Sequence, residues 1–364
     1  MKMLMRILDK SIKKPYEIII TDDFVTLENK IKETLVPSSL LIVTDDHVEK
    51  LYLKEVTDRL DDIAPVYTHV IKAGEISKTL DTVTRIYETL IGNNLDRSTM
   101  IVALGGGVVG DIAGFVAASY MRGIPFIQIP TTVVAQNDSS IGGKVGVDYF
   151  AHKNMIGAFC DPKLVYINVS TLKTLCDREF VGGLAEVVKH ALIKDETFYE
   201  YLNESREGIL KKDTQALLEM TYRSCQIKAE VVEQDSHEMG IRKILNFGHT
   251  VGHAIETLSQ FAIIHGECVG YGISISSYIS YRRNLITQEE LQGIISTCKQ
   301  YGLLTPLKHH SIEEILEQMK YDKKKSHHKI SFILLDKIGE ALIVCDVTDD
   351  EISQAVLFTE KTCH

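Results

Sequence analysis

The first half of the chain alternates short apolar segments with segments of helical periodicity, and this alternation constrains the fold more than any other feature. Leu40–Thr44, Thr99–Leu104 and Phe126–Pro130 each have the length and apolar character of a buried strand, and Val66–Lys72 is a further apolar run. Ser77–Gly92 carries apolar residues at helical spacing, and the Gly-rich segment after the second strand is expected to begin another helix. Strands that alternate with helices predict a parallel sheet with helices on both faces.

The second half of the chain has a different character, because no proline occurs between Pro162 and Pro306. Four segments of this interval have the pattern of helices: Gly183–Lys194, Asp213–Glu233, Thr250–Gln260 and Glu267–Tyr281. Near the end, two apolar segments flank a polar turn and predict a hairpin: Ile330–Leu335 and Ala341–Cys345. We therefore expect an α/β, Rossmann-like domain at residues 1–174 and a mostly α-helical domain at residues 175–364.

Charge and composition exclude several classes of protein. The formal net charge of −10 argues against general affinity for nucleic acid or for an anionic membrane surface. No apolar run approaches the ~18 residues of a membrane span, and the first segment lacks the pattern of a signal peptide. The seven cysteines are scattered and form no C-x-x-C pair, which is typical of reduced thiols. These features predict a cytoplasmic enzyme without nucleic acid or membrane partners.

Three histidines fall within one stretch of small and apolar residues, Leu245–Glu267. His249 and His253 are four residues apart and would share one face of a helix, and His265 follows twelve residues later. Neutral imidazoles from two elements suit a divalent cation, and hydrogen-bonded core histidines are the alternative. Thr250 stands where an H-E-x-x-H metalloprotease has its glutamate, so a zinc hydrolase of that class is disfavoured.

A site for a divalent cation also needs a carboxylate, and Glu186 is the candidate. It lies in the segment GGLAEVVKH, among small and apolar residues, with Lys189 one helical turn later. We interpret Glu186 as the oxygen ligand that completes the histidine cluster.

Gly105–Gly110 satisfies the pattern G-x-G-x-x-G between a predicted strand and a predicted helix. The backbone N–H groups of such a loop can hold a pyrophosphate, although tight packing of helix against strand also requires glycines. No acidic residue lies at positions 112–137, where a contact with the ribose is expected. Asp45, after an earlier strand, is the candidate for that contact, and Glu75 with Lys78 can also reach it unless they form a surface pair.

Basic and polar residues gather in Gln136–Gly157, which we interpret as a loop that surrounds a polar ligand. Lys144, Lys153 and Asn154 lie in this segment, and Arg122 precedes it. Such side chains suit a carboxylate or a phosphate, and a solvated turn region is the alternative. Four more polar residues lead into the histidine stretch: Lys228, Glu238, Arg242 and Asn246.

In their combination and order, these stretches resemble one enzyme family. The segments that carry the resemblance are GGGVVGDIAGF, YMRGIPFIQIPTT, DSSIGGK, KNMIGAF, REFVGGLAEVVKH, GIRKILNFGHTVGHAIE, HGE and DKK. Over nearly its whole length the chain resembles the 3-dehydroquinate synthases, of the sugar phosphate cyclase group. The resemblance implies a homodimeric cytosolic lyase of the shikimate pathway of aromatic amino acid biosynthesis, which uses NAD and a divalent metal, zinc or cobalt.

The resemblance also implies a reaction. The substrate would be an anionic sugar phosphate, 3-deoxy-D-arabino-heptulosonate 7-phosphate, and the products 3-dehydroquinate and phosphate. Metal-assisted oxidation by NAD would acidify the neighbouring C–H and allow phosphate to leave. Return of the hydride and an intramolecular aldol step would follow, so NAD would be regenerated in each turnover.

By position, the resemblance assigns roles to the candidate residues. The metal ligands would be Glu186, His249 and His265. The substrate and acid–base residues would be Arg122, Lys144, Lys153, Asn154, Lys189, Lys228, Glu238, Arg242, Asn246, His253 and Lys323. The residues that meet NAD would be Asp45, Glu75, Lys78, Gly105, Gly106, Gly107, Val108, Val109, Gly110, Asp111, Thr131, Thr132, Asp138, Lys144, Lys153, Thr171, Leu172 and Thr174.

The chain departs from the family pattern at five positions: His47, Asn137, His152, His190 and Ser236. The pattern has Asn, a small apolar residue, Gly, Tyr and Glu there, in that order. These departures concern the adenosine contacts and the packing behind the site, and they leave the metal ligands and the basic residues intact.

Three alternatives stay open. A metal- and NAD-dependent polyol dehydrogenase would give no reason for so many basic residues. A cyclase that makes an amino-cyclitol precursor from glucose 6-phosphate would have no substrate carboxylate to bind. A non-catalytic NAD- or metal-sensing protein is the third class.

Overall fold

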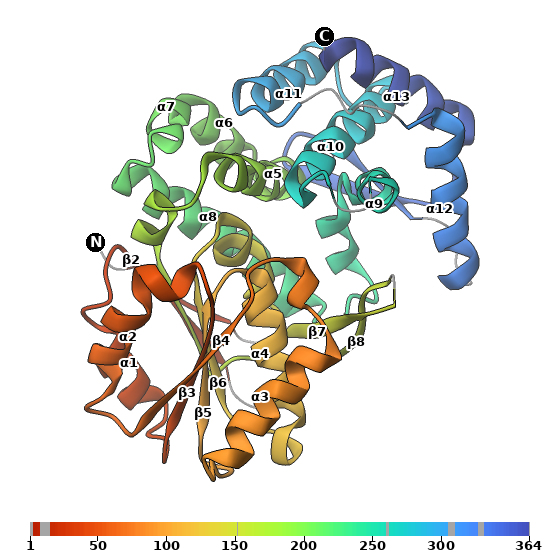
Figure 1. The fold of residues 1–364 in the computed structure, drawn as a ribbon. Coiled ribbons are helices and arrows are strands. Elements are labelled where there is room, and N and C mark those ends of the chain that lie inside the picture. The colour runs from red at the N-terminus through yellow and green to blue at the C-terminus, as the bar shows by residue number, and fades with distance from the viewer. Residues whose placement is uncertain are drawn as a thin grey trace. The chain divides into compact units, whose positions relative to one another are not determined.

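The computed structural model describes residues 3–7, 15–150, 152–259, 262–304, 310–326 and 331–363. The chain divides into two compact units, whose helices and strands are labelled in Figure 1. The first unit contains residues 1–175 and 217–236, and the second contains residues 176–216 and 237–364. No helix in the described ranges is both long enough and apolar enough to cross a membrane.

The first unit is built on a seven-stranded sheet with the order β1-β2-β9-β6-β5-β3-β4. Its strands are β1 (Met3–Ile7), β2 (Tyr16–Thr21), β3 (Leu40–Asp45), β4 (Val66–Ile71), β5 (Met100–Gly105), β6 (Phe126–Pro130) and β9 (Leu164–Asn168). Only β1 and β2 pair in antiparallel fashion, and the other neighbours are parallel. The predicted α/β fold with a mostly parallel sheet is confirmed, with β1, β2 and β9 as strands that the sequence analysis did not identify.

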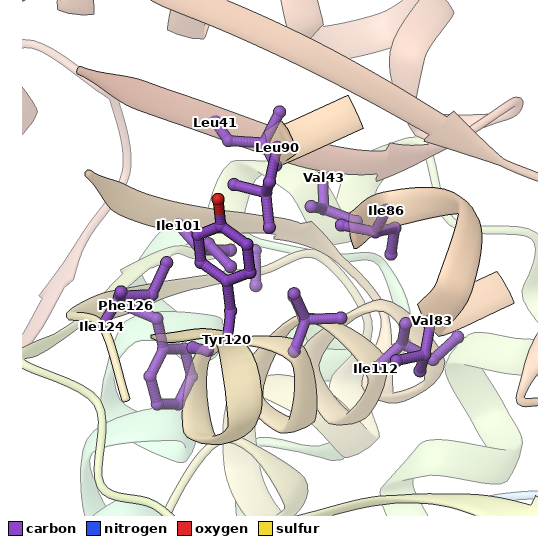
Figure 2. Close-up of a cluster of buried hydrophobic side chains, with 14 of the residues drawn as sticks. Leu41, Val43, Val83, Ile86, Leu90, Ile101, Ile112, Tyr120, Ile124 and Phe126 are labelled. Atoms are coloured by element: carbon purple, nitrogen blue, oxygen red, sulfur yellow. The ribbon is translucent and has the colours of Figure 1, made fainter. Parts of the chain in front are cut away.

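Alternate residues of the central strands pack on opposite faces of this sheet, because successive side chains of a strand point to opposite sides. Leu41, Ile101, Ile86 and Ile112 belong to one hydrophobic cluster on one face, in which Leu41 lies beside Leu90 (Figure 2). The helices are α1 (Leu27–Thr34) and α2 (Lys54–Leu60) on one face, and α3 (Leu80–Gly92) and α4 (Gly107–Ser119) on the other. Each such Ile or Leu is fully buried, which stabilises the fold by roughly 1.5–3 kcal/mol.

The interpretation of Gln136–Gly157 as a loop is wrong, because most of this segment is a hairpin. After a helical turn at Ala135–Ser139, β7 (Lys144–Tyr149) pairs with β8 (His152–Phe159) in antiparallel fashion. Four alternating apolar residues hold the hairpin on the core of the first unit: Val145, Val147, Ile156 and Ala158. This alternation is a strand signal that the many polar residues of the segment obscured.

The second unit is mostly helical, as predicted. Its elements are α5 (Asp177–Lys194), α6 (Glu196–Glu204), α7 (Arg206–Leu210), α9 (His249–Leu258), α10 (His265–Arg282), α11 (Gln288–Gln300), α12 (Ile312–Ser326), β10 (Phe332–Lys337), β11 (Glu340–Val344) and α13 (Asp349–Cys363). Helix α8 (Thr214–Gln234) contributes its first three residues to this unit and the rest to the first unit. The predicted C-terminal hairpin is confirmed as β10 and β11, which pair in antiparallel fashion.

Candidate functional site

Three helices of the second unit bring one carboxylate and two imidazoles together. Glu186 lies in the middle of α5, while His249 and His265 are the first residues of α9 and α10. The Nε2 atoms of His249 and His265 lie 3.3 Å and 3.0 Å from the same oxygen, Oε1 of Glu186. The potential ligand atoms of the three residues lie within 4.8 Å of one another, so a single cation can reach all three.

The electrostatics of this cluster favour an anionic Glu186. The side chain is fully buried, and Lys189, one turn later on α5, forms an ion pair with its other oxygen, Oε2. Burial by itself would raise the pKa of Glu186, but Lys189 and His249 outweigh it and hold that pKa well below its usual range. Burial lowers the pKa of His249, so this ring favours the neutral form that binds metal.

The rings of the cluster are oriented by neighbouring acceptors. The Nδ1 atom of His249 lies 3.1 Å from the carbonyl oxygen of Phe247. If Nδ1 carries the proton and donates it to this oxygen, Nε2, which faces Glu186, is unprotonated. His253 lies one turn along α9 with an exposed side chain, and its ring centroid is 5.1 Å from that of His249. His253 is therefore beside the three converging groups, where it can reach a ligand of the cation.

Glycine contacts let the helices that carry these residues approach closely. A Cβ on Gly266, which follows His265, would collide with the carbonyl oxygen of Gly182 on α5. A Cβ on Gly272 of α10 would collide with the carbonyl oxygen of Gly248, the residue before His249. The glycines of the histidine stretch thus have a packing function. They allow α5, α9 and α10 to lie close enough for Glu186, His249 and His265 to converge.

The chemistry of this donor set fits a divalent cation. Two imidazole nitrogens and one carboxylate oxygen are ligands that Zn²⁺ and Co²⁺ accept, and three protein ligands leave coordination positions open for a substrate. Glu186, His249 and His265 would hold the cation. In the described part of the chain, His253, Glu256 and His265 form a second group of similar spacing that shares one histidine with the first.

The G-x-G-x-x-G segment joins β5 to α4 in the first unit. Gly105 ends the strand, Gly106 precedes the helix in extended conformation, and Gly107 begins it. A Cβ on Gly106 would lie 3.1 Å from the Thr132 side chain, and one on Gly107 would lie 3.0 Å from Oγ of Ser139. The first N–H groups of α4 have no acceptor within the helix, so this tightly packed terminus can accept the phosphates of a dinucleotide.

Five other residues expected to meet NAD or substrate form one network in the first unit. Nζ of Lys78 lies 2.7 Å from Oδ2 of Asp111 and 2.5 Å from Oδ1 of Asn154. Glu75 lies 3.9 Å from Lys78 and 3.5 Å from Lys153. Burial raises the pKa of Asp111 to about 6, although the charge of Lys78 opposes this effect. Residues distant in the sequence, assigned separately to cofactor and substrate, are thus brought together.

The remaining residues expected at the cofactor lie at the carboxyl ends of the strands or shortly after them. Oδ1 of Asp45, at the end of β3, accepts the N–H groups of His47 and Val48. Asp138 pairs with Lys228 of α8 at 2.6 Å. The others are Thr131 and Thr132 after β6, Val108, Val109 and Gly110 in α4, and Thr171, Leu172 and Thr174 in or next to a helical turn after β9.

The basic and polar residues expected at the substrate are placed as follows. Arg242 is buried in the helical turn Ile241–Asn246 of the second unit, where Asn246 donates to Oε1 of Glu238 at 2.8 Å. Lys144 begins β7 with an exposed side chain, and Arg122 is exposed after α4. Lys323 belongs to α12, and its side chain lies outside the described atoms.

Two acidic residues near these clusters were not identified from the sequence. Glu256 of α9 is buried, and its Oε2 lies 3.5 Å from Nδ1 of His265. Glu256 is seven residues, or about two helical turns, after His249, so both lie on the same face of the helix. This spacing is the sequence signal that identifies Glu256. Asp148 of β7 accepts the N–H of Asn154 at 2.7 Å, a contact that became visible only with the hairpin register.

Comparison with known proteins relates both halves of the chain to one family. The profile described as 3-dehydroquinate synthase N-terminal matches residues 68–182, and that described as 3-dehydroquinate synthase C-terminal matches residues 183–325. A 3-dehydroquinate synthase from Acetivibrio thermocellus is 46% identical over 346 residues, which cover 94% of this chain and 96% of the relative.

Solved structures of sugar phosphate cyclases share the fold. A 2-epi-5-epi-valiolone synthase from Streptomyces hygroscopicus, with NAD⁺ and Zn²⁺ bound, aligns with a TM-score of 0.88 at 28% identity over 96% of this chain and 98% of its own. A 2-deoxy-scyllo-inosose synthase complexed with carbaglucose-6-phosphate, NAD⁺ and Co²⁺ also has a TM-score of 0.88, at 26% identity over 97% of this chain and 99% of its own. Since the identity to the Acetivibrio enzyme extends over nearly the whole of both chains, this chain belongs to the 3-dehydroquinate synthase family.

Proposed function

We propose that this chain is a 3-dehydroquinate synthase, which converts 3-deoxy-D-arabino-heptulosonate 7-phosphate to 3-dehydroquinate and phosphate in the shikimate pathway. The observation that carries this conclusion is the 46% identity to a 3-dehydroquinate synthase over 94% of the chain. The cofactors are NAD and a divalent cation, zinc or cobalt, the groups bound by the two related cyclases.

The cation is held by Glu186, His249 and His265. When bound, the cation would lower the pKa of hydroxyl groups on the reacting carbons, and NAD would supply a reversible hydride transfer. Lys189 keeps Glu186 anionic from the side opposite the histidines, because it pairs with Oε2 while Oε1 faces the rings. His253 is the residue placed to accept and donate protons beside them.

NAD is held by the loops of the first unit. The N-terminus of α4 receives the pyrophosphate, and the network of Lys78, Asp111 and Asn154 orients the group next to it. Oδ1 of Asp45 accepts hydrogen bonds from two backbone N–H groups, and the second carboxylate oxygen accepts hydrogen bonds from the ribose hydroxyls.

The basic residues bind the phosphate and carboxylate of the substrate. Lys189, Lys228 and Arg242 are all buried or nearly so in a chain of net charge −10. Burying several cations is costly unless anionic groups accompany them, and a substrate with both a phosphate and a carboxylate adds to the anions that the protein supplies. Ion pairs of basic residues with the phosphate and the carboxylate supply rate through positioning and electrostatic stabilisation.

Two properties of the assembled enzyme belong to the same proposal. The enzyme is a homodimer, as the family resemblance implies, and it resides in the cytoplasm, where scattered cysteines stay reduced. Sedimentation of the purified protein at several concentrations tests the dimer.

The decisive experiment offers the purified protein three substrates in the presence of NAD and Zn²⁺ or Co²⁺. With the heptulosonate phosphate we expect release of inorganic phosphate and formation of the carbocyclic product. Glucose 6-phosphate and a neutral polyol are the matched alternatives, because the first lacks a carboxylate and the second lacks both charges. Preference for glucose 6-phosphate would assign the chain to another cyclase activity, and preference for the polyol would assign it to a dehydrogenase.

A further inference from the structure

Both ring nitrogens of His265 face carboxylates. Its Nε2 lies 3.0 Å from Oε1 of Glu186, and its Nδ1 lies 3.5 Å from Oε2 of Glu256. Glu256 is 4% exposed, and a carboxylate buried to this degree requires a partner or a function.

The two histidines of the candidate metal centre are oriented by different kinds of group. The partner of Nδ1 of His249 is the backbone carbonyl of Phe247, two residues away, which follows from local chain geometry. The group facing Nδ1 of His265 is a side chain on another helix, α9. The orientation of His265 thus depends on the packing of α9 against α10 and on the identity of residue 256.

We propose that Glu256 is a positioning residue of the metal centre. It accepts a hydrogen bond from Nδ1–H of His265, which fixes the tautomer with a bare Nε2 directed at the cation and increases the basicity of that nitrogen. The proposal rests on the ligand set Glu186, His249 and His265 proposed above.

A second cation is the competing explanation for the same residues, because His253, Glu256 and His265 are spaced closely enough to bind one. Occupation of both groups would require His265 to bridge two cations through both nitrogens, without a proton on either. A neutral imidazole has one unprotonated nitrogen and one N–H group. A single cation on the unprotonated nitrogen of His265, with Glu256 accepting from its N–H group, therefore needs no further deprotonation of the ring.

The test measures metal binding rather than turnover. Zn²⁺ affinity is determined by competition with a chromophoric chelator, and the Co²⁺-loaded protein is examined by its visible absorption spectrum. Glu256→Ala should weaken Zn²⁺ binding by about 10–100-fold and alter the Co²⁺ spectrum. Glu256→Gln, whose amide oxygen still accepts the hydrogen bond, should retain the spectrum and lose less affinity, which separates the proposed role from a failure to fold.

The matched control is Glu267→Gln, two residues after His265. Glu267 pairs with Arg178 at 2.9 Å and caps the start of α10, but contributes to neither candidate metal-ligand group. This variant should lower thermal stability while leaving Zn²⁺ affinity and the Co²⁺ spectrum unchanged. If it matches Glu256→Ala in both measurements, the effect is a general loosening of α10 and the positioning role is overturned.

Two further results decide between the proposals. His265→Ala should lose tight Zn²⁺ binding, and retention of the metal would overturn the ligand set itself. If His265→Ala loses the metal while Glu256→Ala keeps native affinity and spectrum, only the role of Glu256 fails. A stoichiometry of two Zn²⁺ per chain that falls to one in Glu256→Ala would establish the second cation instead.

Discussion

Gly272 of α10 lies against the backbone of Gly248, so that a single methyl group on Gly272 would overlap the Gly248 carbonyl oxygen. Gly248 itself has φ of +79°, a left-handed conformation that favours glycine, and immediately precedes His249, a proposed metal ligand. The position of His249 relative to α10 is therefore set by a backbone contact that only two glycines permit.

Gly272→Ala should accordingly displace the start of α9 and disrupt the metal centre. We expect a loss of about 1–3 kcal/mol in the free energy of unfolding, as for other overpacked sites, together with weaker Zn²⁺ binding. Gly293→Ala in α11 is the control, because the nearest atom to its Cβ is Oη of Tyr199 at an ordinary 3.6 Å. That variant should be neutral or more stable by roughly 0.5–1 kcal/mol, as measured by urea unfolding.

Replacement of any one proposed metal ligand, Glu186, His249 or His265, by Ala should abolish tight metal binding and activity. After dialysis, the bound metal measured by elemental analysis should fall below about one tenth of the native content, because a three-ligand site has lost a ligand. His69→Ala, which removes a histidine bonded to Thr89 in the first unit, should keep its metal. Metal retained in all three ligand variants would rule out this assignment.

His253→Ala should behave differently from the ligand variants. As an acid–base or substrate residue beside the cluster, His253 can be lost without loss of metal or NAD, while turnover falls. The measurement is metal content and NAD affinity alongside kcat. Loss of the metal from this variant would mean that His249 and His253 ligate together.

NAD should act as a catalyst that is not consumed. Both hydride transfers take place on one bound substrate, so many turnovers are expected at NAD concentrations well below that of the substrate. Absorbance at the NADH wavelength should stay flat while phosphate accumulates. Release of one NADH per substrate would instead favour a polyol dehydrogenase.

Arg242→Ala should lower kcat/KM for the heptulosonate phosphate by at least tenfold, about 1.4 kcal/mol, because a planar guanidinium suited to an oxyanion is lost. NAD affinity should scarcely change. Arg242→Lys keeps the charge without the planar guanidinium, so it separates loss of anion recognition from loss of stability. Arg85→Ala is the control for loss of an arginine elsewhere, because it removes only an exposed ion pair with Asp81. Normal turnover in both Arg242→Ala and Lys153→Ala, or a better reaction with a neutral polyol, would contradict the anion assignment.

The pH dependence of stability should carry a signature of Asp111. Burial raises its pKa to about 6 in the folded chain, above the ordinary value of an aspartate. The folded chain binds this proton more tightly than the unfolded chain does, which stabilises the fold. This stabilisation is complete below about pH 4 and is lost as the pH rises through about 6. As the pH rises from 5 to 8, the free energy of unfolding of the native protein should fall by about 1.4 kcal/mol relative to that of Asp111→Asn, which has no carboxyl group to titrate at this position. Urea unfolding without NAD measures this difference, and a pH-independent difference would contradict the raised pKa.

The amino-acid sequence by itself determined the fold class and the elements with strong periodicity. The strands at Leu40, Thr99 and Phe126 and the helices that carry the histidines were identified within a few residues of their ends. Glu186, His249 and His265 were chosen as ligands from residue type and family resemblance, and their roles stay predictions, as does the domain boundary after residue 174. Local patterns suffice for these features because the period of buried residues is a property of each segment alone.

Only the tertiary structure decided which side chains meet. The pairing of β7 with β8 packs one face of the hairpin on the core of the first unit, and its register sets the contact between Asp148 and Asn154. The approach of Glu256 to His265 depends on how closely α9 and α10 pack, which glycine contacts determine. Such contacts join residues from different elements, and their distances follow from the packing of whole helices and strands, which no single segment of sequence specifies.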